Sequence, residues 1–139
     1  MSQPRIVRRL TVAAVAVLST LLWAATPAAA SADTTPPSTP VWGYAQGFQC
    51  LSVIVGVPRS TDDVTPQSQI VYRVLADGVD IGALSDRGAD SGVWGVLQLP
   101  HAGPNSVTVQ AVDLAGNRST SRPVTVTGYF TPGCTPFHL

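Results

Sequence analysis

The stretch Ser106–Ser119, SVTVQAVDLAGNRS, decides the fold of this 139-residue chain. In its first half valine and alanine alternate with serine, threonine and glutamine, which is the period of a strand with one buried face. The run Asp-Leu-Ala-Gly-Asn that follows, residues 113–117, has the chemistry of a tight turn. A second alternating run, residues 123–127, comes after the turn. The pattern predicts a β-hairpin, and we expect the chain before it to form the rest of a sandwich.

Other runs with the same period precede the hairpin, and glycine, proline or Asp-Gly turn signals separate them. The expected strands cover residues 41–45, 49–57, 69–76, 79–84, 93–99, 105–113 and 122–128. No stretch has a helical period, and the absence of Lys and Glu argues against long surface helices. The sequence therefore predicts an all-β protein, a seven-stranded antiparallel Greek-key sandwich.

The alternation also predicts which side chains form the core. In the second expected strand Leu51, Val53, Val55 and Val57 share one face, and Ile54 lies on the other. The remaining core residues that the pattern predicts are Tyr72, Val74, Leu97, Leu99, Val107, Val109 and Ala111.

The first 32 residues have the pattern of a secretory signal peptide. A short arginine-rich segment precedes the apolar run Leu10–Ala25, and small residues allow cleavage after Ala30 or, as we favour, after Ala32. The apolar run of about 16 residues is short for a membrane span. The alternatives are an uncleaved N-terminal anchor and, at Arg8-Arg9, a twin-arginine signal. We expect a signal peptide at 1–32, a Pro/Thr-rich leader at 33–40, the sandwich at 41–128 and a C-terminal coil at 129–139.

The two cysteines, Cys50 and Cys134, predict a disulfide, because an even pair in a secreted protein is normally oxidised. Two cysteines without a nearby histidine are too few for a zinc site. In seven alternating strands the start of the second and the end of the seventh lie at one pole, so the pair can meet. The bond would close a loop of roughly 85 residues, which contributes on the order of 4–5 kcal/mol in the chain-entropy model.

The charges limit the classes of function. Eight basic and eight acidic residues balance over the whole chain, but three arginines lie in the signal segment, so the rest of the chain is acidic. Because no basic patch is present, we expect no nucleic-acid partner. The chain also lacks Glu, a Gly-x-Ser-x-Gly motif and a glycine-rich phosphate loop. We therefore expect a protein that is not an enzyme, with no catalytic residues and no cofactor.

Two pairs of aspartates, Asp62-Asp63 and Asp86…Asp90, lie in expected loops. Calcium needs several oxygens at one point, and one loop alone lacks them. The spacing of an EF-hand is absent. The favoured interpretation is that these side chains cap their own turns, so we expect no metal site.

Several short motifs occur in a recognisable order. They are DTTPPSTP at 33–40, STDD at 60–63, YRV at 72–74, DG at 77–78 and AVDLAGNRS at 111–119. In this order they resemble a fibronectin type III domain of secreted actinobacterial proteins, over about residues 33–128. The resemblance implies a sandwich and no particular ligand. Val57 stands where this family usually has Trp, and Asn105 where it usually has the tyrosine-corner Tyr. A bacterial immunoglobulin-like domain is therefore the second interpretation.

The outward faces of the second and fifth strands hold the candidate contact residues. An exposed Trp beside aliphatic side chains is a plausible contact patch, and aromatic faces stack on sugar rings. The candidates are Trp94, Ile54 and Val96, which share a sheet if the type III strand order holds, with Trp42 and Tyr44 extending the patch on the first strand. The alternative is that Trp94 only packs under residues 85–92 or under the C-terminal tail.

These observations predict a secreted, extracellular and monomeric module without a stable membrane span. We expect it to bind or space something outside the cell, in association with polysaccharide. The partner is then an extracellular glycan. The alternative is a cell-envelope module for protein–protein interaction or adhesion, with an extracellular protein as its partner.

Overall fold

The computed structural model describes residues 32–86 and 92–134. The signal-peptide prediction falls almost entirely on residues 1–31, outside the described residues, as do residues 87–91 of one loop and residues 135–139 of the tail. In the part of the chain that the structure describes, no helix has the length and apolar character needed to cross a membrane.

Nearly all of the regular structure is β-strand. The elements are β1 (Tyr44–Gly47), β2 (Ser52–Val57), the 3-10 turn η1 (Gln67–Gln69), β3 (Val71–Ala76), β4 (Val79–Asp86), β5 (Val93–Gln98), β6 (Gly103–Val112), β7 (Arg118–Thr120) and β8 (Val124–Gly128). Each strand pairing is antiparallel. The predicted all-β antiparallel sandwich is confirmed.

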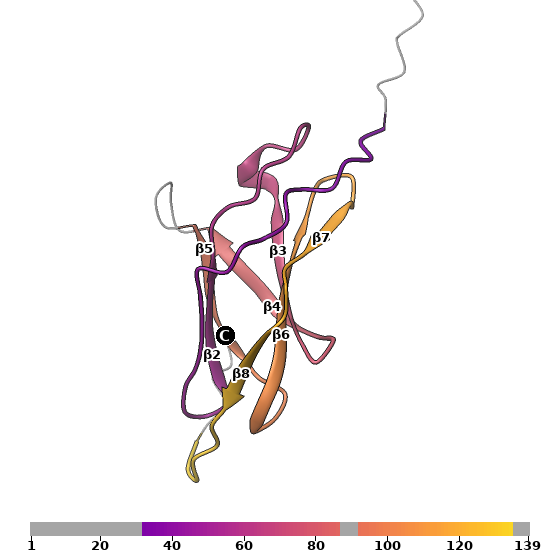
Figure 1. Cartoon of the computed structure of the whole chain (residues 1–139). Helices are drawn as coiled ribbons and strands as arrows, with labels where there is room; N and C mark the ends of the chain where they lie inside the picture. The colour runs from indigo at the N-terminus through magenta and orange to yellow at the C-terminus, as the bar shows by residue number, and fades with distance from the viewer. Residues whose placement is uncertain (1–31, 87–91, 135–139) are drawn as a thin grey trace, which may run out of the picture. The chain divides into compact units, whose positions relative to one another are not determined.

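The strands form two layers around a common interior (Figure 1). One layer has the order β1-β2-β5, and in the other β3 lies between β4 and β6, with β7 and β8 both paired to β6. The last two residues of β4, Ser85 and Asp86, leave β3 and pair with β5. The two layers are therefore continuous at this corner.

The hairpin that organises the sequence has the predicted form. Val112 of β6 pairs with Arg118 of β7 across the turn. In the turn the Asn117 N–H donates to Asp113 Oδ1 at 2.8 Å, and Gly116 has a φ of 91°, which glycine adopts without strain. A second tight turn, at Asp77 and Gly78, joins β3 to β4 with positive φ at both residues, as the Asp-Gly signal predicts.

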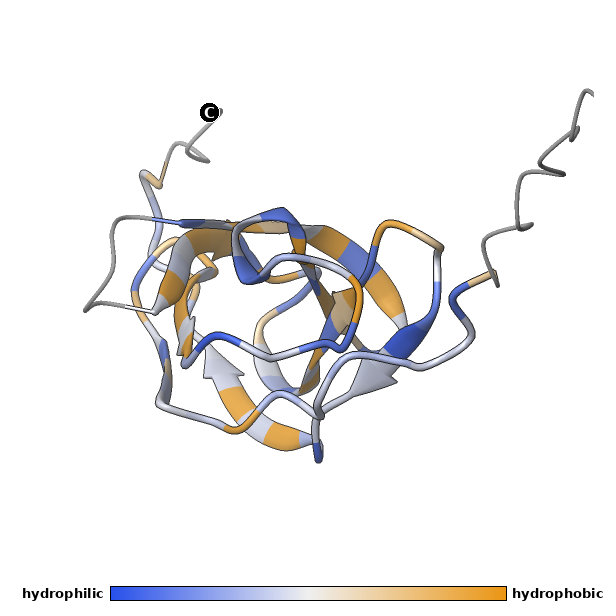
Figure 2. Cartoon of the chain, turned by 90° about the horizontal axis from the view of Figure 1, so that it is seen from above, coloured by the Kyte–Doolittle hydropathy of each residue, from blue (hydrophilic) through white to orange (hydrophobic). Residues whose placement is uncertain are grey.

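The core lies between the two layers and follows the predicted alternation. Apolar bands recur along the strands in Figure 2. Leu51 and Leu97 are half-buried against the core, and the rest of the predicted core set is buried. The buried apolar residues are Val53, Val55, Val57, Ile70, Tyr72, Val74, Ala76, Leu84, Val93, Leu99, Val107, Val109, Ala111 and Val126. The predicted core is therefore confirmed.

The structure has eight strands where the sequence predicts seven. The predicted last strand, 122–128, corresponds to β8, and the short strand β7 before it is additional, with a division between the two at Ser121. At the division the Val109 N–H donates to Ser121 Oγ at 2.9 Å, while the Ser121 N–H donates to the Val109 carbonyl. A side-chain oxygen thus replaces a backbone carbonyl in the ladder. Pro123 lacks an N–H, so it cannot donate a backbone hydrogen bond that would continue the ladder. The first strand also starts later than predicted, at Tyr44, because the chain bends at Gly43.

The predicted disulfide is confirmed. Cys50 precedes β2 and Cys134 follows β8, and the two Cα atoms lie 5.2 Å apart. The bond joins the segment after β8 to the start of the β2 strand. The described part of the tail, residues 129–134, has no strand or helix, in agreement with the predicted coil.

Candidate functional site

The outer face of β1, β2 and β5 holds four of the five predicted contact residues. The register places Ile54 opposite Val96, and Gly56 opposite both Tyr44 and Trp94. All of these residues point away from the core, because side chains alternate between the faces of a strand. Tyr44 is 45% exposed and Val96 is 39% exposed, while Ile54 and Trp94 are half-buried. We call Tyr44, Ile54, Trp94 and Val96 the sheet face.

Tyr44 and Trp94 flank a glycine on this surface. A Cβ added to Gly56 would overlap the ring of Tyr44. Because Gly56 has no side chain, the ring of Tyr44 lies directly on its backbone. Since Gly56 pairs with Tyr44 on one side and Trp94 on the other, the two aromatic residues come from strands that are both neighbours of β2. Tyr44 and Trp94 therefore form an aromatic surface that lies close to the backbone of the sheet.

Trp42 does not belong to the sheet face, and its placement there was wrong. The indole N–H donates to the carbonyl of Arg122 at 2.7 Å, and the ring packs against the core. Trp42 comes before the bend at Gly43, so the alternation that sets the direction of Tyr44 does not extend back to it. It lines a separate hollow of about 360 Å³ together with Pro40 and Arg122.

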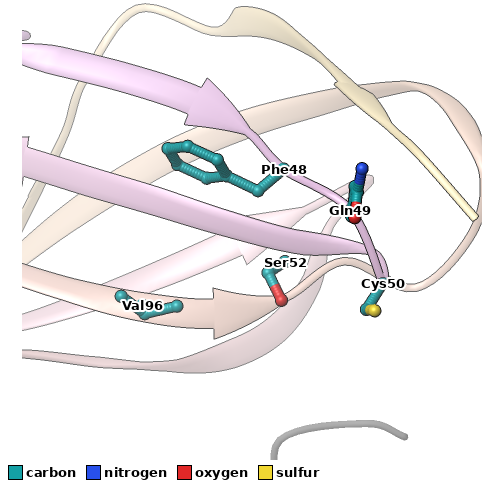
Figure 3. Close-up of a pocket in the computed structure, with 5 residues that line it drawn as sticks. All are labelled: Phe48, Gln49, Cys50, Ser52 and Val96. Carbon is teal, nitrogen blue, oxygen red and sulfur yellow. The ribbon is translucent and has the colours of Figure 1, made fainter. Parts of the chain in front are cut away.

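A shallow hollow of about 540 Å³ adjoins the sheet face at the turn between β1 and β2. Its lining residues are Phe48, Gln49, Cys50, Ser52 and Val96. In Figure 3 Ser52 and Val96 lie on the same side of the Phe48 ring. Phe48 is 45% exposed. The Ser52 hydroxyl is shielded from solvent and has no hydrogen-bond partner. The hollow therefore offers an aromatic wall beside the sheet face, with the Ser52 hydroxyl buried beneath its surface.

Charged side chains elsewhere form ion pairs. Arg59 pairs with Asp86, and Arg73 pairs with Asp80 at 2.5 Å. The Arg73 hydrogen bond lowers the pKa of Asp80, and this effect outweighs the partial burial that would raise it. Of the aspartates weighed as calcium ligands in the sequence, Asp86 is thus held by an arginine, and Asp90 lies outside the described residues.

His101 also has a carboxylate partner. Its Nδ1 lies 2.9 Å from the carbonyl oxygen of Ala102, and its Nε2 lies 3.0 Å from Asp77 Oδ2. The hydrogen bond to the Ala102 carbonyl raises the pKa of His101, desolvation opposes this rise, and the Asp77 carboxylate adds to it. The side chain is about half exposed, so this pair is a surface feature.

Three aspartates that the sequence keeps far apart come together in the structure. Asp33, Asp62 and Asp113 each place one carboxylate oxygen within 4.8 Å of the other two. We call these three residues the aspartate cluster. Because Asp33, Asp62 and Asp113 are far apart in the chain, no local sequence motif predicts this arrangement, and no metal site was expected.

The chain matches no family model, and no curated protein matches it.

Two kinds of site residue were missed because their sequence signals are weak. Phe48 follows Gly47 in an expected turn. A turn has no alternation of apolar and polar residues, so the sequence does not indicate that this aromatic side chain is exposed. Gly56 interrupts an apolar strand, and an isolated strand glycine does indicate a close approach of another group. That signal was present, but only the register identifies Tyr44 as the group that approaches.

Proposed function

We propose that the chain is a secreted, non-catalytic β-sandwich module of the fibronectin type III or bacterial immunoglobulin-like kind that binds extracellular polysaccharide. Its all-β antiparallel architecture and the disulfide between Cys50 and Cys134 support this class. The disulfide is of the kind that persists in an oxidising compartment, which supports a secreted protein. The binding surface in this proposal is the sheet face with the adjoining hollow.

One observation carries the proposal: Tyr44 and Trp94 lie on either side of Gly56 on a surface that points away from the core. Flat aromatic surfaces suit the apolar faces of sugar rings, and tyrosine adds a hydroxyl for a polar contact. Phe48, which is exposed in the hollow, would extend the contact along the same face. A chain of sugars needs such an elongated surface, with polar groups beside apolar ones.

Contact with a cell-envelope protein is the second candidate, and the apolar side chains beside the aromatic pair favour it. Phe48 and Val96 are both exposed. Ile54 is on β2, the middle strand between β1 and β5, and lies opposite Val96. Clustered exposed apolar side chains are typical of protein contacts. The two candidates use the same face but differ in which side chains dominate: the aromatic pair for sugar, and the apolar residues for protein.

The test is depletion of the purified protein from solution by chitin, cellulose and isolated bacterial cell wall. We expect at least one of these solids to retain the protein, and Tyr44→Ala and Trp94→Ala to reduce the bound fraction at least tenfold. Tyr129→Ala is the matched control, because Tyr129 is also an exposed tyrosine but follows β8. Each variant is first shown to have the wild-type circular dichroism spectrum.

Retention that is equal in wild type and both variants would contradict the sheet face as the binding surface. Failure of every solid to retain the wild-type protein would reject the polysaccharide proposal and favour the protein-contact candidate.

A further inference from the structure

The aspartate cluster lies at one end of the sandwich, and three distant segments build it. Asp33 belongs to the leader, Asp62 to the loop after β2, and Asp113 to the turn after β6. These segments gather at the same end in Figure 1. Since β2 starts beside the disulfide and ends before Asp62, the cluster and the hollow at Cys50 lie at opposite ends of this strand. The cluster is therefore separate from the proposed binding surface.

Local hydrogen bonds fix one carboxylate oxygen of Asp33 and one of Asp62. Asp33 Oδ1 accepts the Thr35 N–H at 3.0 Å. Asp62 Oδ2 accepts the N–H groups of Val64 and Thr65 at 3.1 and 2.8 Å. These are turns in which an aspartate caps its own backbone, as the sequence predicted for Asp62. Such bonds orient each carboxylate but use only one of its two oxygens.

Asp113 is the most buried member, and Asn117 holds it on both oxygens. The Asn117 backbone N–H donates to Oδ1 at 2.8 Å, and its side-chain amide donates to Oδ2 at 2.7 Å. Burial acts to raise the pKa of Asp113, but the hydrogen bonds from Asn117 outweigh it and leave the pKa below its ordinary value. The two hydrogen bonds from Asn117 therefore orient the Asp113 carboxylate within the cluster.

The second oxygens of the other two aspartates have no partner. Asp33 Oδ2 and Asp62 Oδ1 each expose less than 1 Å² to solvent and make no hydrogen bond. A buried carboxylate oxygen without a donor is costly, and native structures normally supply one or an ion. Two such oxygens in one cluster of three carboxylates could both accept a positively charged ligand.

Within residues 32–86 and 92–134, no ion pair balances the charge of the cluster. Among the described residues the ion pairs join Arg59 to Asp86, Arg73 to Asp80 and His101 to Asp77, and none includes a cluster member. Three carboxylates within a few ångströms repel one another, most strongly where they are shielded from water.

We propose that Asp33, Asp62 and Asp113 form a calcium-binding site. Calcium takes oxygen ligands at about 2.3–2.6 Å, so two ligands of one ion lie at most about 5 Å apart. The 4.8 Å limit within the cluster fits this range. Magnesium keeps several of its waters and is normally held by one or two carboxylates, so a site of three carboxylates suits calcium better. The ligand set contains no histidine or cysteine, which distinguishes it from a zinc site.

Calcium would attach the leader to the sandwich. The Asn117 side-chain amide already donates to the carbonyls of Asp33 and Thr35 at 3.2 and 3.3 Å. Thr35 Oγ1 donates to Asp63 Oδ2 at 3.3 Å. Further along the leader, Ser38 and Thr61 are joined by two hydrogen bonds of 2.8 Å. A divalent ion shared by Asp33, Asp62 and Asp113 would add a strong link at the start of the leader, where the contacts are longer.

The test compares the thermal unfolding of the purified, disulfide-bonded protein in EDTA and in calcium at constant ionic strength. Extracellular calcium modules bind with a Kd up to about 1 mM, so about 5 mM calcium should raise the Tm by roughly 5–10 °C. Magnesium at the same concentration should give a smaller rise. Calorimetric titration should give one calcium per chain.

The variants are Asp62→Asn and Asp33→Asn, and Asp63→Asn is the matched control. Asparagine keeps an oxygen to cap the turn at residue 62, so Asp62→Asn should fold, and in EDTA it should be no less stable than wild type because repulsion is relieved. Both cluster variants should lose the calcium-dependent rise, while Asp63→Asn keeps it. No calcium binding by wild type, an equal response to magnesium, or a full calcium response in both cluster variants would each overturn the proposal.

Discussion

The ring of Tyr44 lies on the backbone of Gly56, its direct partner across the β1–β2 ladder. A side chain on residue 56 and the ring of Tyr44 cannot occupy this space together. We therefore expect Gly56→Ala to displace the ring and to reduce the free energy of unfolding by about 1–3 kcal/mol, the usual range for overpacking. Chemical denaturation of the two proteins measures this difference.

A double-mutant cycle with Tyr44→Ala isolates the contact. Once the ring is removed, Gly56→Ala should cost at least about 0.5 kcal/mol less than in the wild-type background. Equal costs in both backgrounds would show that the strain at Gly56 does not come from Tyr44.

The disulfide between Cys50 and Cys134 should supply a large part of the stability. Its cysteines are 84 positions apart, and a loop of this size contributes up to about 4–5 kcal/mol by restricting the unfolded chain. We expect the Cys50→Ser/Cys134→Ser protein to unfold with about 2–5 kcal/mol less free energy than the oxidised wild type. Urea denaturation with and without reductant measures this. Reductant should not affect the double variant, and an unchanged wild-type midpoint after complete reduction would contradict the prediction.

The contact between His101 and Asp77 should help to raise the pKa of this histidine. The folded protein raises the pKa of His101, first through the Ala102 carbonyl and then through Asp77. The associated stability is therefore complete below the ordinary histidine pKa of about 6.5, and it is lost as the pH rises through the higher value of the folded state. Because the pair is exposed, we expect only a small change in stability.

An NMR titration of His101 provides the measurement. Asp77→Asn should lower the pKa of His101 toward its ordinary value while keeping the turn, since asparagine tolerates the positive φ of residue 77. A His101 pKa that is the same in both proteins would show that Asp77 does not act on the ring.

Asn105 should be essential for the loop before β6. The side chain is fully buried, and its amide donates to the carbonyls of His101 and Gly103 at 3.1 and 2.9 Å. Asn105→Ala leaves both carbonyls without this donor, and we expect a loss of about 1–3 kcal/mol in the free energy of unfolding. Asn105→Asp should cost more, because it buries a charge beside the same carbonyls. A change below about 0.5 kcal/mol in Asn105→Ala would contradict this role.

The core and the turns could be predicted from the sequence because both depend on local pattern. The alternation at Val107 and Val109 gives the buried face of β6 directly, and Asp77-Gly78 gives the β3–β4 turn. The division between β7 and β8 could not be predicted in the same way. It depends on the Ser121 hydroxyl replacing a carbonyl in the ladder, and a serine in a strand has no such signature.

The candidate sites depend on register and topology, and this explains what the sequence missed. The alternation correctly placed Trp94 on an outer face, but the pairing of Gly56 with both Tyr44 and Trp94 appears only once β1, β2 and β5 are aligned. Asp33 and Asp113 are 80 positions apart in the chain. Only the folded topology brings both of them to Asp62.

The most direct test of the proposed binding surface is an NMR map of the protein with a soluble oligosaccharide, prepared from whichever polysaccharide retains it. We expect the shifted amides to lie in β1, β2 and β5 around Tyr44, Gly56 and Trp94, and to continue toward Phe48. Shifts that are confined to the opposite layer, or the absence of any shift at millimolar oligosaccharide, would contradict the proposal that this face binds sugar.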